Sequence, residues 1–314
     1  AAFMDPPRFG SGYAALFQTI AFVPETHMLK PFPVRVKSTY ALMQTIIEEG
    51  ALHAKEIREK RLASIKAMIR QQEYPLDWIE DSSKVDKITF LGYSSGTKTS
   101  KVTGMQRLYY DRSKPYTKQV DYYNYFTGTR IIKKPRAYII PQGWHQVIGL
   151  LERNAVKMKR LNRDTVILVN IYRIEDYQTR SRPYEKHYQH YGTKLTQKKD
   201  SVRFLKGDYY IPTGQRSDRF LVEMLEPAGD DSYFAWNFFD AILQQKEGYS
   251  DYRWEDVAAK YLDEHPELRA KLEERKNNDP KFAASAAAQL QFVYLNSPWY
   301  EPAHLRYPVF RLEN

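Results

Sequence analysis

Glu25 is the residue of this 314-residue chain whose type and position most suggest chemistry. It follows an apolar run whose second half, residues 21–23, is typical of a buried strand that Pro24 then ends. A carboxylate at the end of a buried strand lies where α/β folds place their sites, and partial desolvation there would raise its pKa toward a range useful for proton transfer. Spacing alone leaves a second interpretation open, in which Glu25 only pairs with His27 or Lys30 at the surface.

The segment around Glu25, SGYAALFQTIAFVPETHMLKPF at residues 11–32, resembles the end of the catalytic domain in the zinc metallocarboxypeptidases of the carboxypeptidase A-like family, specifically large bacterial members of the Bacteroidetes type. The resemblance implies that Glu25 is the general base and acid that acts on zinc-bound water. It also implies a tyrosine that covers the terminal carboxylate of the substrate, and Tyr13 is the nearest candidate, although it lies closer to Glu25 than in the family pattern. Four later segments resemble the C-terminal region of the same bacterial group: AYIIPQGW, GDYYIPTGQ, LVEMLEP and SYFAWNFFD.

The zinc ligands of that family are an HxxE pair and a later histidine, all of which precede the glutamate. The resemblance therefore implies that zinc and its ligands belong to an absent N-terminal segment, and that this chain alone is inactive. His53-Ala54-Lys55-Glu56 does spell HxxE, but it follows Glu25 and lies in a charged stretch that is typical of a helix. An i,i+3 pair there is more simply a solvated helix face, so we expect no metal ligand in this chain.

Two other histidines, His187 and His190, lie beside Glu185 and raise the possibility of a metal site. The surrounding tyrosines favour a strand or loop, and on a strand the two histidines would face opposite sides. We therefore expect exposed side chains without a specific metal.

Composition excludes some classes of protein. Without cysteine the chain has no disulfide, thiol nucleophile or cysteine-ligated metal. No apolar run approaches the roughly 20 residues that span a bilayer, so no transmembrane segment is expected. The resemblance implies an exported protein that is periplasmic, outer-membrane-associated or secreted, with the N-terminal remainder of the catalytic domain and a peptide or protein substrate as partners.

Positive charge is concentrated in residues 97–206, which hold 24 lysines and arginines against 8 acidic residues. Clustered tyrosines accompany them, a combination that binders of single-stranded nucleic acid use for phosphate contacts and stacking. Tyrosine and arginine also populate ordinary sheets and protein interfaces, and no helix-turn-helix, zinc-finger or RNP-like pattern is present. We expect no sequence-specific nucleic-acid binding.

Hydrophobic spacing predicts a long helix over residues 34–72, kinked or divided at Gly50, which would close the catalytic domain by packing across its sheet. From residue 84 to 126, short runs of alternating apolar and polar residues predict hairpin-like strands. Further strands are predicted up to residue 212, on either side of one helix at 144–154. The apolar residues 233–245 predict a buried helix capped by Asp231 and Ser232. Helices are also expected at 251–262, at 266–276 and after Asp279-Pro280, before a tail, residues 297–314, that runs back over another unit.

The expected fold is α/β and α+β, in three parts. Residues 1–80 would be the end of a carboxypeptidase-like α/β catalytic domain, residues 81–228 a β-rich α+β domain, and residues 229–314 a helical region packed on the preceding domain. Two functions remain open: the C-terminal part of an exported zinc metallocarboxypeptidase, or a non-catalytic accessory module that binds a peptide, a glycan or a protein.

Overall fold

The computed structural model describes residues 4–245 and 247–313, and it shows a mixed α/β chain with several antiparallel sheets. Two compact units are present: unit 1 holds the chain up to residue 134 with 214–224 and 229–231, and unit 2 holds 135–213, 225–228 and the chain from 232 onward. No helix in the described part is long and apolar enough to cross a membrane.

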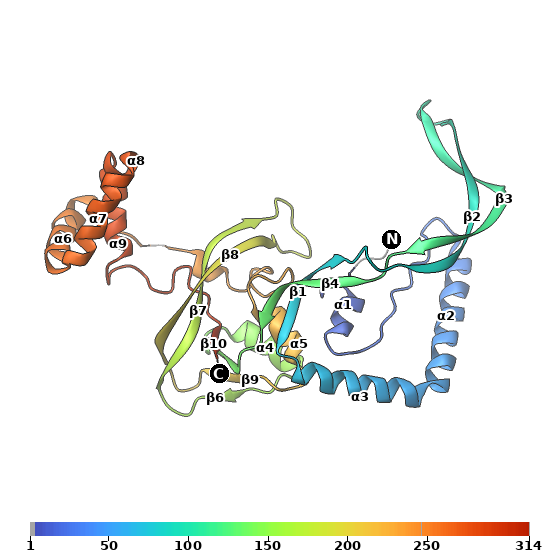
Figure 1. Ribbon diagram of the computed structural model, residues 1–314, viewed down its shortest axis with the longest axis horizontal. Coiled ribbons are helices and arrows are strands. Elements are labelled where there is room, and N and C mark those ends of the chain that lie inside the picture. The colour runs from blue at the N-terminus through green and yellow to red at the C-terminus, as the bar shows by residue number, and fades with distance from the viewer. Residues whose placement is uncertain (1–3, 246, 314) are drawn as a thin grey trace. The chain divides into compact units, whose positions relative to one another are not determined.

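The helices of unit 1 begin with the short α1 (Gly10–Ala15), followed by α2 (Phe32–Leu52) and α3 (Ala54–Arg70). Pro33 occupies the first turn of α2, where its missing N–H costs nothing. The expected long helix is divided at His53 and not at Gly50, and Figure 1 shows α2 and α3 meeting at a sharp bend. Ser11 lies inside α1, and Phe9 is the N-cap.

Unit 1 also contains two antiparallel pairs of strands. Strand β1 (Glu73–Glu80) pairs with β4 (Phe126–Lys133), so residues on both sides of position 80 belong to one sheet. Between them, β2 (Asp86–Thr99) and β3 (Gln106–Tyr122) form one long hairpin with a register shift at Tyr93/Ser94. Figure 1 shows this hairpin as a two-stranded ribbon with no other strand beside it.

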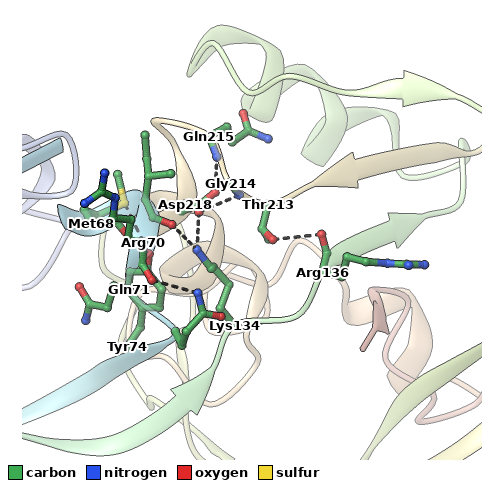
Figure 2. A network of polar contacts seen from close by, with 12 residues as sticks. Met68, Arg70, Gln71, Tyr74, Lys134, Arg136, Thr213, Gly214, Gln215 and Asp218 are labelled. Carbon is green, nitrogen blue, oxygen red and sulfur yellow. Dashed lines mark hydrogen bonds and ion pairs between the residues drawn. The ribbon is translucent and has the colours of Figure 1, made fainter. Parts of the chain in front are cut away.

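A buried ion pair joins distant parts of unit 1. Lys134, at the end of β4, donates to the carbonyl of Ile69 in α3 at 2.6 Å and to Asp218 Oδ2 at 2.9 Å. Asp218 begins α5 (Asp218–Leu225) and also accepts from the backbone N–H groups of Gly214 and Gln215, both at 2.9 Å (Figure 2). These bonds fix the first residue of α5 to the turn that precedes the helix, and the contacts of Lys134 tie it to the end of α3. The adjacent apolar core of unit 1 comprises Met68, Tyr74, Leu76 and Val222.

Unit 2 is built on a six-stranded antiparallel sheet of order β6-β9-β5-β10-β7-β8. Its strands are β5 (Ala137–Ile140), β6 (Lys159–Arg160), β7 (Thr165–Thr179), β8 (His190–Phe204), β9 (Tyr209–Pro212) and β10 (Phe310–Leu312). Helix α4 (His145–Arg153) buries Val147, Ile148 and Leu151 and confirms the helix predicted at 144–154, and β5 is fully buried.

The C-terminal tail supplies a central strand of this sheet, because β10 pairs with β5 on one side and with β7 on the other. Its Arg311 is buried and forms an ion pair with Glu226 at 3.3 Å and a hydrogen bond to the hydroxyl of Tyr172. Tyr138 donates to the other oxygen of Glu226 at 2.7 Å. Burial raises the pKa of Glu226, while Arg311 and Tyr138 oppose the shift.

The prediction of a helix at residues 233–245 is wrong. Turns replace most of it, and only a short 3₁₀ helix, η1 (Asp240–Leu243), forms. Asn237 adopts a left-handed conformation with φ 66°, which breaks any helix there, whereas Ser232 does accept from the N–H of Ala235. The prediction that this segment belongs to the core is confirmed, since Phe234 and Phe239 are fully buried.

The last helices share one core cluster that includes Trp254, Leu262, Leu268 and Phe282. Helices α6 (Asp251–Glu264) and α7 (Pro266–Asn278) confirm the prediction. The third expected helix is divided into α8 (Pro280–Ala283) and α9 (Ala286–Leu295), because Ser285 leaves helical geometry and caps α9 through the N–H of Ala288.

Candidate functional site

Glu25 lies in an irregular, exposed segment between α1 and α2. The buried strand expected at residues 21–23 is not formed, and Phe22 and Val23 are 63% and 58% exposed. A strand needs a neighbour for its backbone N–H and C=O groups, and the described residues offer this segment none. The carboxylate therefore lacks the desolvated strand-end setting that the sequence suggested.

The immediate neighbours of Glu25 make a local turn of their own. The N–H of Lys30 donates to the carbonyl of His27, and the ring Nδ1 of His27 accepts from the N–H of Leu29 at 3.2 Å. No described residue forms an ion pair or a hydrogen bond with Glu25, so the surface pairing with His27 or Lys30 is not seen either.

Tyr13, the second candidate residue, belongs to the packing of α1. Its ring meets Phe17 edge-to-face at 5.4 Å, and Phe17 in turn stacks on Phe220 of α5. Gly12 lets α1 approach the preceding backbone closely, because a Cβ at that position would overlap the carbonyl oxygens of Asp5 and Pro6. Glu25 and Tyr13 form no hydrogen bond with each other, so the structure does not join these two residues in one site.

Helix α2, directly after the Glu25 segment, buries none of its 21 residues. Val36, Tyr40, Met43 and Ile47 recur at helical spacing and are all exposed. The expectation that this helix packs across a sheet is therefore wrong for the described residues. We call these four residues with Phe22 and Val23 the uncovered apolar face.

The HxxE sequence forms a solvated charge cluster, as the sequence suggested. The His53 ring lies 3.7 Å from Glu56 and 3.5 Å from Glu49, and all three side chains are more than half exposed. Glu56 also pairs with Lys60 at 2.7 Å, and the ammonium group holds the pKa of this carboxyl below its usual range. Throughout residues 4–245 and 247–313, no group of three or more histidine or acidic side chains could hold a metal ion.

His190 corrects the expectation of an exposed histidine pair, because it is buried. Its ring contacts Thr179 Oγ1 at 2.9 Å, Asp240 Oδ1 at 3.0 Å and the side-chain nitrogen of Asn237 at 3.1 Å. His187 points elsewhere and packs against Trp236 and Phe238. The two histidines therefore serve separate structural contacts and share no ligand set.

The sequence reading missed the acidic residues of LVEMLEP, although two acids inside an apolar run are a signal for buried charge. Glu223 is 3% exposed and pairs with Arg219 at 2.5 Å. Burial raises the pKa of Glu223 to about 7, with Asp231 and Asp230 adding to the shift and Arg219 opposing it. This pair lines a cavity of about 690 Å³ in unit 1, together with Leu16, Met68, Leu76 and Trp78.

Comparison with known proteins adds no identification: no family model, no curated protein and no solved structure matches this chain.

Proposed function

We propose that this chain is the C-terminal part of an exported zinc metallocarboxypeptidase, which hydrolyses peptide bonds at the C-termini of its substrates, with Glu25 as general base and acid. Two facts support the proposal. Residues 11–32 resemble the end of such a catalytic domain, and the segment that carries Glu25 has an apolar face that nothing in the described chain covers.

The uncovered apolar face carries the proposal. A helix with an apolar stripe normally covers a core, and a large exposed apolar patch marks a surface that another polypeptide covers. Phe22 and Val23 extend the same exposed character up to Glu25. All of this surface would be covered if the sheet of an α/β catalytic domain packed on α2 and paired with residues 21–23. Pairing would also desolvate the neighbouring carboxylate of Glu25, which raises the pKa of a carboxyl group toward values suited to proton transfer.

The residues of this chain do not fit a zinc site, since no suitable group of ligands occurs in its described part and His53 and Glu56 belong to a solvated helix surface. The proposal therefore assigns zinc and its ligands to polypeptide outside these residues. In this proposal the chain supplies the carboxylate of Glu25, which accepts a proton and returns it.

The complete encoded protein provides the test. We expect it to release C-terminal residues from peptides, and Glu25→Gln to lower kcat by roughly 10²–10⁴-fold, the usual contribution of a general acid–base group. Glu48→Gln, on the exposed surface of α2, is the matched control and should leave kcat unchanged. Full activity in the Glu25→Gln enzyme would refute the assignment.

A second candidate function is a non-catalytic module that binds a peptide, a glycan or a protein. The hairpin of β2 and β3 favours it, because Leu91, Val102, Met105 and Leu108 are all more than half exposed on this arm. Two observations together would support this module over the peptidase. The complete protein would bind a peptide saturably without hydrolysing it, and its sequence would contain no HxxE followed by a later histidine.

A further inference from the structure

Two arginines face each other within the unit 2 sheet, and no ion pair neutralises either of them. Arg173 in β7 and Arg306 in the segment before β10 form an isolated antiparallel bridge. Residues directly opposite in such a bridge send their side chains to the same face, with Cβ atoms about 4.5–5.5 Å apart, and like charges in that position repel.

Neither guanidinium group has a carboxylate partner. Arg173 donates to the carbonyl of His304 at 2.8 Å and lies over the ring of Tyr300, whereas the side chain of Arg306 forms no hydrogen bond or ion pair with any described residue. Both side chains are half-buried. Burial, together with the charge of Arg173, lowers the pKa of Arg306, and the carboxylates of Glu301 and Asp200 partly offset this shift. A half-buried, unpaired guanidinium is a costly arrangement unless an anion completes it.

A cavity of about 760 Å³ lies over this pair. Its charged lining consists of four cations and one anion: Arg173, Lys198, Arg203, Arg306 and Asp200. Asp200 forms an ion pair with Lys198 at 2.7 Å and also acts electrostatically on Arg306, and Arg203 pairs with Asp164 at 2.7 Å. Arg173 and Arg306 are therefore the cations of this lining that form no ion pair with a described residue. The hydroxyl groups of Thr196 and Ser201 line the same cavity and can donate to an anion.

We infer that this cavity binds a small oxyanion, a phosphate or carboxylate group, held between the guanidinium groups of Arg173 and Arg306. The planar guanidinium group of an arginine forms bidentate hydrogen bonds to the oxygens of a phosphate or a carboxylate, and two guanidinium groups on one face can bind a single anion. The volume is within the usual range of small-molecule sites. The inference does not depend on the proposed peptidase function, since the cavity lies in unit 2 and Glu25 in unit 1.

Thermal unfolding of the chain tests the inference. It is measured with inorganic phosphate, with acetate and with sodium chloride at matched ionic strength. A ligand that binds only the folded state raises Tm in a saturable way. We expect phosphate or acetate to raise Tm beyond chloride, and the stronger of the two identifies the source of the oxyanion. Equal shifts in all three salts would overturn the inference.

Arg306→Gln is the decisive variant, and Arg163→Gln is its control, because Arg163 is an exposed arginine of the same unit that does not line the cavity. We expect Arg306→Gln to abolish the anion-dependent shift in Tm and Arg163→Gln to retain it. Without added anion, Arg306→Gln should unfold at the same Tm as the parent or a higher one, because the substitution removes the repulsion from Arg173. A large loss of Tm without anion, or an anion-dependent shift that survives in Arg306→Gln, would show that the arginine has a purely structural role.

A second variant keeps the test decisive if Arg306→Gln fails to fold. Thr196→Trp places a bulky ring from the exposed face of β8 into the cavity, directly across from Arg173. It should weaken phosphate or acetate binding at least tenfold in calorimetry, whereas undiminished affinity would overturn the proposed location.

Discussion

The ammonium group of Lys134 lies 2.9 Å from Oδ2 of Asp218, although 84 residues separate them, and only 6% and 0% of the two side chains are exposed. This pair connects the end of β4, the last carbonyls of α3 and the first turn of α5 (Figure 2). Buried charges are costly unless paired and hydrogen-bonded, and here each is bound on more than one side.

Removal of one partner of this pair should be strongly destabilising. We expect Asp218→Ala to lower the free energy of unfolding by about 3–5 kcal/mol, because it leaves the charge of Lys134 buried and unpaired. Denaturant unfolding measures the change. The exposed pair of Lys87 and Asp121 is the control, and Asp121→Ala should cost no more than about 1 kcal/mol. Equal effects of the two substitutions would contradict the structural role of the buried pair.

The pKa of Glu223 predicts a pH dependence of stability. In the folded chain burial raises this pKa from 4.5 to about 7. Between pH 4.5 and 7 the carboxyl group therefore keeps its proton in the folded state but has lost it in the unfolded state. The resulting stabilisation is fully present below pH 4.5 and is lost as the pH rises through 7. It amounts to at most about 3 kcal/mol. Unfolding at several pH values should show this decline in the parent chain and a smaller one in Glu223→Gln; the same profile in both would rule out Glu223 as the source.

Arg311 should hold the C-terminal strand in place. We expect Arg311→Met to destabilise unit 2 by about 3–5 kcal/mol, because Glu226 is then left buried without a cation, with tyrosine hydroxyls, those of Tyr138 and Tyr172, as its donors. Hydrogen exchange at β5 and β10 would report the change directly. The double variant Arg311→Met/Glu226→Leu should recover much of the loss, since no unpaired charge remains. A single variant as stable as the parent would refute this role.

The uncovered apolar face predicts mild effects on folding and a strong effect on assembly. Ile47→Asp in α2 should change the free energy of unfolding of this chain by no more than about 0.5 kcal/mol, as for other surface positions. Met68→Ala in the core should cost about 2–5 kcal/mol. If the proposed catalytic domain covers α2, the same Ile47→Asp should destabilise that domain in a protein that contains both. If Ile47→Asp instead leaves the complete protein unaffected, α2 is not covered by other polypeptide.

The basic residues 97–206 should not read a nucleic-acid sequence. We expect binding to oligonucleotides, if any, to be weak, to fall steeply with salt and to be independent of sequence. Nanomolar affinity for one sequence in about 150 mM salt would contradict this.

The sequence by itself determined the elements that depend on local signals. Pro33 in the first turn of α2, Asp279 as the cap of α8 and the apolar spacing of α4, α6 and α7 act within a few residues, so they could be read without the fold. The resemblance around Glu25 likewise rests on contiguous residues.

Only the tertiary structure decided which apolar runs are buried and which charges meet. Residues 21–23 are apolar enough for a strand, yet a strand exists only where a neighbour supplies the other half of its hydrogen bonds. Residues 233–245 are apolar enough for a helix, yet the large rings of Phe234 and Phe239 find their contacts in a series of turns. Lys134 and Asp218 lie far apart in the chain, and only the folded backbone brings them together as an ion pair. The same is true of Arg173 and Arg306, which the fold places side by side with like charges.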